Sequence, residues 1–371
     1  MSYLTFYGNI IVKNIVLRKK AIEIISLEER INQYINEELL NFNNIKPYYL
    51  DETDFRNQVL KRLFLQKYSK KSQSEEAKSY TAQKVDDILT NNLPFIFCFC
   101  FGGYKHFWSP TYPEPDWAEI FTIKYLMEYI LPIARAYSYG TTLEFESEEV
   151  AISAMNNVPQ DGLDKYNTIF KELLEYISSN CKEPLNLNLV LARDFYDKNE
   201  LFSKIKDYKN VVEERFKKLD KEDQQKRLKR TETNIKWDGE KDLTKLNEKD
   251  KESVIYNSRI LNEAFLDIDY ELRGKEYFDK KNLIPLVGTW GLGREGEAWL
   301  HIASNRSSIV DFWAGIGIFE IRGEKIVERT LSKKQFEQVK DHLIKVNIKT
   351  EISKFSNNYS WIYVYEGELN F

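Results

Sequence analysis

LPFIFCFCF, residues Leu93 to Phe101, is the stretch of sequence that decides the fold. It is short, continuously apolar and rich in aromatic residues, and it is bounded by Pro94 and by Gly102-Gly103. A run of this kind is typical of a β-strand that is covered on both faces, as the strands of a parallel sheet are. The sequence therefore predicts the central strand of an α/β unit here.

The residues that follow this strand predict a helix and a second strand. From Asp116 onward, apolar residues recur with helical spacing until Tyr139-Gly140, and TTLEFES (Thr141 to Ser147) then reads as a strand. A strand, a helix of about twenty residues and another strand form a βαβ unit with parallel strands and a right-handed crossover. Because ligands of such sheets bind beyond the carboxyl ends of the strands, we expect the binding loop between Gly102 and Pro115.

The whole chain is predicted to be an α/β protein: a Rossmann-like mixed sheet flanked by helices, with a helical N-terminal region and a charged helical insertion. Its 371 residues exceed the usual size of a single core. We divide it into a helical N-terminal region (1–92), the first half of the α/β core (93–200), a charged helical insertion or linker (201–254) and the second half of the core (255–371).

Further elements follow from the same patterns, and the carboxyl third is expected to extend or adjoin the sheet begun at Leu93. The segment Lys217 to Ser253 is dominated by charged residues and predicts a solvated helix followed by a linker. The remaining expected elements are helices at Leu163–Ser178, Ile255–Gly274 and Ser332–Lys345, a strand at Leu185–Leu191, a pair of strands at Ile284–Trp290 and Ala298–Ser304, and an apolar run at Val310–Ile321.

Composition excludes several classes of protein. Lys and Arg number 54 against 58 Asp and Glu, a net charge of −4, so the basic excess that general nucleic-acid binding requires is missing. The longest apolar run is far shorter than the roughly 20 residues that span a bilayer. Three cysteines, an odd number, and an amino terminus without the pattern of a secretory signal favour a cytoplasmic protein.

The first polar cluster is FGGYKHFWSPTYPEPDWAE, from Phe101 to Glu119. Paired glycines allow the backbone to approach a ligand closely, and hydrogen-bond donors that suit a phosphate or carboxylate stand beside them. Neither GxGxxG nor GxxxxGK[ST] is present, so no dinucleotide or P-loop phosphate site is indicated. The expected donors of this cluster are Tyr104, Lys105, His106 and Ser109.

Asp116 and Glu119 allow two interpretations. The order Pro115-Asp116-x-x-Glu119 is typical of a helix start, with Asp116 as the N-cap and Glu119 completing a capping box. Alternatively, one of the two carboxylates takes part in catalysis. The spacing alone leaves both interpretations open.

The second polar cluster lies between Gly288 and Trp313. Arg306 beside two serines can bind an anion with both arms of its guanidinium, and His301 on a strand can serve as an acid or a base. The alternative is a hydrogen-bonded hairpin that contains a structural histidine. The candidate residues of this cluster are Arg294, His301, Arg306, Ser307 and Ser308.

Two further pairs share a strand face. Glu144 and Glu146 can do acid–base work or hold a divalent metal, although solvated charges at a sheet edge are the favoured interpretation. Cys98 and Cys100 are interpreted as buried strand residues, since a single pair without a second Cys or His pair is weak support for a metal site. We therefore expect no metal, and the resemblance described next implies no redox cofactor.

The motifs around the first cluster resemble those of the isocyanide (isonitrile) synthases of pyoverdine and dityrosine biosynthesis, which show Lys-Ser-Pro-Asn followed by a Pro-Asp-x-x-Glu helix. Here three residues separate Lys105 from Ser109, and Thr111 stands in place of the Asn. A Trp-His pair is interrupted by Leu300. The positions that carry the resemblance are Lys105, Ser109, Pro110, Pro115, Asp116 and Glu119.

The resemblance implies a small-molecule enzyme of amino-acid-derived secondary metabolism. Its substrates would be an amino acid and a sugar phosphate, ribulose 5-phosphate, with Lys105 and Arg306 as phosphate or carboxylate contacts and Glu119 or His301 moving protons. An iron- and 2-oxoglutarate-dependent oxygenase is the implied partner. The alternative is a non-catalytic protein that binds a ligand or partner through its helical N-terminal region and the segment Lys217 to Ser253.

Overall fold

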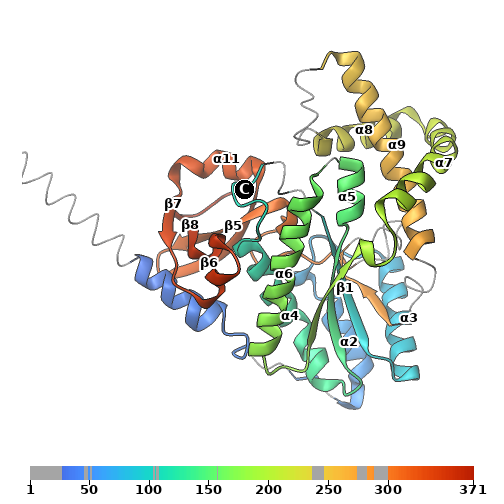
Figure 1. Ribbon diagram of the computed structural model, residues 1–371. Coiled ribbons are helices and arrows are strands. Elements are labelled where there is room, and N and C mark those ends of the chain that lie inside the picture. Colours follow the sequence, from blue (N-terminus) through green and yellow to red (C-terminus); the bar gives the residue numbers. More distant parts are fainter. Residues whose placement is uncertain are drawn as a thin grey trace, which may run out of the picture.

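The structure, a computed structural model, describes residues 27–45, 49–50, 52–102, 105, 108–156, 158–235, 246–273, 282–287 and 300–371. A sheet of four parallel strands, in the order β3-β2-β1-β4, forms its centre. Both the expected α/β class and the expected helices on the faces of the sheet are confirmed (Figure 1). The strands are β1 (Phe95–Phe101), β2 (Thr141–Ser147), β3 (Asn186–Leu191) and β4 (Leu283–Pro285).

The βαβ unit that the sequence predicts is present. β1 pairs with β2 in parallel from Phe95 and Thr141 to Phe101 and Ser147, and α4 (Trp117–Ala136) connects them. The phenylalanines of β1 pack against aromatic residues on one face of the sheet; Phe101, for example, meets Phe170 of α6 (Gln160–Asn180) edge to face. Figure 1 shows α4 and α6 on one side of β1 and α3 (Glu75–Asn91) on the other.

The N-terminal region is helical where the structure describes it. Residues 27–34 form an α-helix that continues as the π-helix η1 (Ile35–Leu39), and α2 (Phe55–Leu63), η3 (Gln66–Tyr68) and α3 follow. Their buried residues belong to the same hydrophobic core as the central sheet. Among the described residues, no helix is both long enough and apolar enough to cross a membrane.

The carboxyl third differs from the expectation, because only β4 extends the central sheet. The other strands form a second sheet in the order β6-β5-β8-β7, with β5 antiparallel to β6 and parallel to β8. The reason lies in α4, most of whose residues are buried, so that a second layer covers the side that the central sheet leaves open. The strands are β5 (Gly315–Arg322), β6 (Lys325–Ser332), β7 (Ile344–Asn347) and β8 (Trp361–Glu366).

The helix expected at Ser332–Lys345 is shorter than predicted. Ser332 caps α11 (Lys333–Val339), and the chain then turns through a 3-10 segment into β7. Ile344 and Lys345 pair with β8. Strand pairing therefore overrides the helical spacing of the last expected turn.

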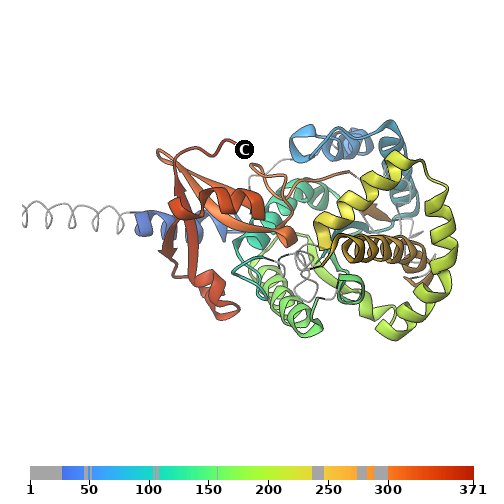
Figure 2. The same cartoon turned by 90° about the horizontal axis from the view of Figure 1, so that it is seen from above.

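Three helices at the other end of the molecule form a separate unit, as Figures 1 and 2 both show. α7 (Lys198–Lys217) and α9 (Glu248–Arg273) pack against α5 (Glu149–Asn156) around an apolar cluster of their own. α8 (Lys221–Ile235) lies on α9, where Arg227 pairs with Glu263. The expected solvated helix is thus present, but part of the expected linker is the start of α9.

The strand pair expected at Ile284–Trp290 and Ala298–Ser304 lies partly outside the described residues. β4 pairs with β1 in parallel. The amides of Leu300 and Ile302 donate to the carbonyls of Pro285 and Leu286 at 3.2 and 2.9 Å. The two segments are therefore in contact, although residues 300–304 do not form an extended strand.

Candidate functional site

The first turn of α4 forms the site at the carboxyl end of the central strand. Asp116 caps the helix: its Oδ1 accepts from the amide of Ala118 at 2.8 Å, and the amide of Asp116 donates to Glu119 Oε2 at 2.7 Å. This is the capping box that the spacing predicts. Capping fixes both carboxylates at the start of the helix and so determines what else they can reach.

Lys105 meets both capping carboxylates. Its Nζ lies 2.7 and 2.9 Å from the two carboxylate oxygens of Glu119 and 2.9 Å from Asp116 Oδ2. The three side chains are at most 3% exposed. Charges buried to this extent are retained only when they are paired, and here one ammonium is shared by two carboxylates. The capping interpretation is therefore confirmed, and it does not exclude a second role.

Hydroxyl groups complete the environment of the two carboxylates. Tyr166 of α6 donates to Glu119 Oε1 at 2.5 Å, and Thr111 Oγ1 donates to Asp116 Oδ2 at 2.8 Å. Ser109 Oγ lies 2.6 Å from Thr111 Oγ1, which links Ser109 to the carboxylates through one intermediate. We call Lys105, Asp116, Glu119 and Tyr166 the Lys105 cluster.

The second sheet closes the site from the side of α4. The amide of Gly317 in β5 donates to Asp116 Oδ1 at 3.1 Å. A Cβ at this glycine would lie 2.4 Å from the backbone nitrogen of Ala118, so only glycine lets β5 approach the first turn of α4 this closely. The apolar run that contains Gly317 thus contributes directly to the site.

The electrostatics of the Lys105 cluster favour a proton on Glu119. Burial raises the pKa of Glu119 to about 7; the charge of Lys105 opposes this rise, and the charge of Asp116 adds to it. Burial alone would lower the pKa of Lys105, but Asp116 and Glu119 outweigh it and raise that pKa. Glu119 can therefore gain and lose a proton near neutral pH while Lys105 stays charged.

A buried tyrosine hydroxyl lies near this cluster. Tyr359 is completely buried, and its hydroxyl has no hydrogen-bond partner among the described residues. Burial, followed by the charges of Glu119 and Asp116, raises the pKa of Tyr359 well above its ordinary value. A buried hydroxyl without a partner costs free energy, so it is a donor that a bound ligand or water can satisfy.

His301 is fixed by a different part of the chain. Its backbone adopts a positive φ of 51°, and its carbonyl accepts from the amide of Lys70 at 2.7 Å. Burial, followed by the charges of Lys71 and Lys70, lowers the pKa of His301 to about 4. The imidazole is therefore neutral at pH 7, where it can accept a proton but cannot donate one as an imidazolium.

Arg306 lies away from the Lys105 cluster. Its guanidinium pairs with Glu128 of α4, nine residues beyond Glu119. Nine residues along an α-helix correspond to about 13 Å and to two and a half turns, so Glu119 and Glu128 point to opposite faces of α4. The expectation that Arg306 and Lys105 meet in one site is therefore not fulfilled.

The two serines beside Arg306 hold a turn in place. The amide of Ser307 donates to Asn305 Oδ1 at 2.9 Å, and Ser308 Oγ donates to the carbonyl of Thr330 in β6 at 2.6 Å. These are the bonds of a hairpin, the alternative interpretation of the second polar cluster. The hydroxyl of Ser308 is therefore used within the hairpin and not for the anion that the sequence suggested.

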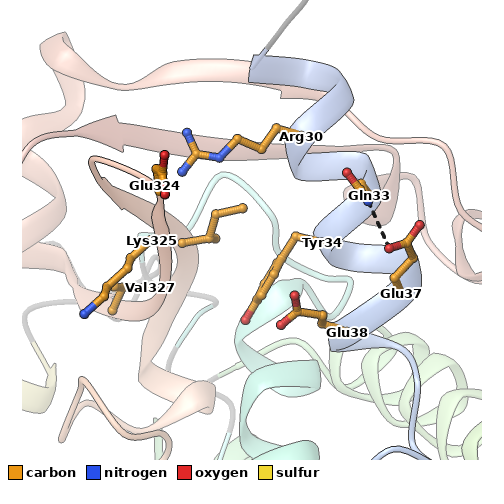
Figure 3. Close-up of a pocket in the computed structure, with 9 residues that line it drawn as sticks. Arg30, Gln33, Tyr34, Glu37, Glu38, Glu324, Lys325 and Val327 are labelled. Atoms are coloured by element: carbon orange, nitrogen blue, oxygen red, sulfur yellow. Dashed lines mark hydrogen bonds between the residues drawn. The ribbon is translucent and has the colours of Figure 1, made fainter.

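Arg306 instead lines a pocket of about 310 Å³ between α4, β6 and the N-terminal helix, which we call the Arg306 pocket. Tyr34 donates to Glu328 there at 2.9 Å. A neighbouring pocket of about 460 Å³ shares Tyr34 and Glu38 (Figure 3). The residues that line the Arg306 pocket are Tyr34, Glu38, Lys124, Tyr125, Glu128, Arg306, Ser307, Ile326, Val327 and Glu328.

Several expectations remain outside the description or need correction. Tyr104, His106 and Arg294 lie outside the described residues. Glu144 and Glu146 are not solvated edge charges, because β2 lies between β1 and β3 and both side chains are buried. Tyr166 was missed by sequence reasoning: its position fits the apolar face of an amphipathic helix, and nothing in the sequence pairs it with Glu119.

Comparison with known proteins supports the fold. No known protein family matches the sequence, and no curated protein is similar to it at the level of sequence. Among solved structures, the PvcA protein from Pseudomonas aeruginosa is similar, with a TM-score of 0.59 and 12% sequence identity. The match covers 84% of this chain and 99% of that one. At this identity the likeness establishes a shared fold.

Proposed function

We propose that this protein is a biosynthetic enzyme of the isocyanide-synthase type, which condenses the amine of an amino acid with a sugar phosphate. The observation that carries the proposal is the Lys105 cluster, which lies at the carboxyl end of the central strand. Three of its four residues, Lys105, Asp116 and Glu119, belong to the resembling motif, and Tyr166 joins them in the fold. Ligands of parallel α/β sheets bind at this end. The fold shared with PvcA agrees with the same resemblance.

Glu119 is the proton carrier of this proposal. Attack of an amine on a ketose carbonyl forms a C–N bond, the amine loses its protons, and the carbonyl oxygen leaves as water. A single carboxyl group with a pKa of about 7 can take the first proton as a base and deliver one to the departing oxygen as an acid. Proton transfer of this kind typically contributes about 10²- to 10⁴-fold to the rate.

Lys105 and Asp116 set the charge of Glu119. Lys105 holds both carboxylates at hydrogen-bond distance, so it positions Glu119 and keeps it partly ionised against the effect of burial. Thr111 and Ser109 continue the chain of hydrogen bonds from Asp116. The buried hydroxyl of Tyr359 is available to a substrate oxygen.

A substrate screen tests the proposal. Purified protein is incubated with ribulose 5-phosphate and each of the twenty amino acids in turn, and mass spectrometry follows both substrates and the product. We expect joint consumption of the sugar phosphate and one amino acid, tyrosine and tryptophan being tried first, and no consumption by heat-denatured protein. Unchanged substrates in all twenty reactions contradict the proposal.

A partner-binding function is the second candidate, and the separate unit of α7, α8 and α9 favours it. Its helices pack around an apolar cluster that they share with α5, and charged residues of α8 face outward. Lys226 and Lys229 are exposed on α8. If the unit binds a partner oxygenase, replacing both lysines by glutamate should abolish capture of that oxygenase in a pull-down without changing thermal stability, whereas unchanged capture contradicts this function.

A further inference from the structure

The face of the central sheet opposite α4 and α6 carries a second group of chemically active side chains. Alternate residues of a strand point to opposite faces. Phenylalanines of β1 therefore face α6, and Cys98 and Cys100 point the other way. The parallel register places Cys98 beside Glu144 and Cys100 beside Glu146. All four side chains are buried.

Three of these side chains converge. Cys98 Sγ lies 3.8 Å from Cys100 Sγ, and Cys100 Sγ lies 2.9 Å from Glu146 Oε2. The two sulfurs and a carboxylate oxygen of Glu146 all lie within 4.8 Å of one another. The group comes from two adjacent strands, whose backbone hydrogen bonds hold it in place whether or not a ligand is present.

The distances suit a tetrahedral metal ion. Two thiolates bound to zinc at about 2.3 Å lie about 3.8 Å apart, which is the separation between Cys98 and Cys100. A thiolate and a carboxylate oxygen on the same ion lie about 3.5 Å apart. The carboxylate of Glu146 therefore has to withdraw from Cys100 by about 0.6 Å, a movement that rotation of its side chain can supply.

The kind of metal follows from the donors. Two sulfur ligands and one carboxylate favour a thiophilic ion such as Zn²⁺, whereas Mg²⁺ and Ca²⁺ require oxygen ligands. Glu144 lies next to Cys98, and Asn188 of β3 donates to it at 3.4 Å. Glu144 is thus the nearest additional carboxylate, and a three-ligand site leaves a fourth position for it or for water.

We propose that Cys98, Cys100 and Glu146 form a binding site for Zn²⁺ or a similar thiophilic divalent cation. The site lies near the carboxyl ends of β1 and β2, on the opposite face of the sheet from the Lys105 cluster. The ion binds two thiolates, whose protons pass to solvent, and one carboxylate. This site is separate from the proposed condensation and does not depend on it.

Cobalt provides the test, because thiolate ligands give bound Co²⁺ an intense near-ultraviolet absorption. Full-length protein without a histidine tag is titrated with Co²⁺ and then with Zn²⁺. We expect one Co²⁺ per chain, the thiolate absorption, its loss when Zn²⁺ displaces the cobalt, and no effect of Mg²⁺. Absence of the absorption from the wild-type protein overturns the proposal.

Variants assign the ligands. Cys98→Ala and Cys100→Ala should each abolish the absorption, while Cys181→Ala, which removes the remaining cysteine, should leave it unchanged. Glu146→Gln should weaken binding by at least the ~10- to 100-fold that even indirect partners of a metal contribute. Absorption that survives in the Cys98→Ala, Cys100→Ala double variant overturns the proposal.

Thermal unfolding of the wild-type protein tests the site even if the ligand variants fail to fold. Because an ion that binds only the folded chain stabilises it, Zn²⁺ should raise the Tm of the wild-type protein, and Mg²⁺ at the same concentration should not. The rise should be absent from any of the ligand variants that folds. An equal Tm with and without Zn²⁺ contradicts the site.

Discussion

The Lys105 cluster and the Arg306 pocket lie on opposite faces of α4, and they differ in how far their charged groups are exposed to water. The ammonium of Lys105 is enclosed with two carboxylates, and all three side chains are at most 3% exposed. Arg306 pairs with Glu128 while its own side chain remains 70% exposed. Water screens the second pair and cannot reach the first. Burial, more than the number of ion pairs, therefore decides where a charge affects stability and chemistry in this molecule.

Lys105→Met should have the largest effect on stability. It removes the cation and leaves Asp116 and Glu119 buried without a counter-charge, which typically costs about 3–5 kcal/mol. The free energy of unfolding, measured with urea, should fall by this amount at pH 8. Lys345→Met is the matched control, because it makes the same substitution at a lysine that contacts the ring of Trp361 and not a pair of carboxylates. A loss in Lys105→Met no greater than that in the control would show that water reaches the Lys105 cluster.

The pH dependence of stability should reveal Glu119. Between its ordinary pKa of 4.5 and its raised pKa of about 7, the folded chain holds a proton that the unfolded chain releases. Rising pH therefore favours the unfolded chain, and this group lowers the free energy of unfolding by about 3 kcal/mol across the window. Stability from this source is complete below pH 4.5 and is lost as the pH passes 7.

Glu119→Gln isolates that contribution, since glutamine does not titrate and its amide oxygen can still accept from the capping amide. The difference in unfolding free energy between wild type and variant should change by about 3 kcal/mol from pH 4.5 to pH 8. A slope that is identical in wild type and Glu119→Gln contradicts the raised pKa.

Tyr166→Phe should have a smaller effect. The variant loses one hydrogen bond to a charged group, which is worth about 1.5–3 kcal/mol, and Lys105 still holds the carboxylate. Because the bond from Tyr166 lowers the pKa of Glu119, the variant should also shift the pH window upward. Tyr125→Phe, which loses a bond to a backbone carbonyl, should leave the window in place.

Arg306→Ala should have the smallest effect. Exposed ion pairs contribute about 0–1 kcal/mol, and salt screens them. Urea unfolding should detect at most this loss at low ionic strength and almost none at 1 M NaCl. A loss as large as that of Lys105→Met would mean that the two faces of α4 do not differ as described.

Local sequence signals predicted the parts of the fold that depend on neighbouring residues. The apolar run at β1, the short strand pattern at β2 and the capping box at Asp116 each involve a few residues, and the structure contains all three. The second sheet was not predicted. Its strands cover a side of α4 that the central sheet leaves uncovered, and such packing is a property of the assembled molecule.

Some residues of the candidate site were likewise predicted from the sequence, and others became apparent only in the folded protein. The motif brought Lys105, Asp116 and Glu119 to attention, and the structure brings them together. Tyr166 could not be found, because its ring fits the apolar face of α6 and its hydroxyl meets Glu119 only in the folded protein. Arg306 was predicted as a phosphate or carboxylate contact like Lys105, because it stands beside two serines and because the resemblance implies this role, but the helical geometry of α4 separates the two.

The most direct test of the central claim compares three proteins in one assay, in which mass spectrometry follows consumption of ribulose 5-phosphate and the reacting amino acid. Wild type should consume both, Arg306→Ala should do so at nearly the same rate, and folded Glu119→Gln should be slower by at least ~100-fold. Consumption by Glu119→Gln at the wild-type rate, or none by wild type with any amino acid, would contradict the claim that the Lys105 cluster is the active site.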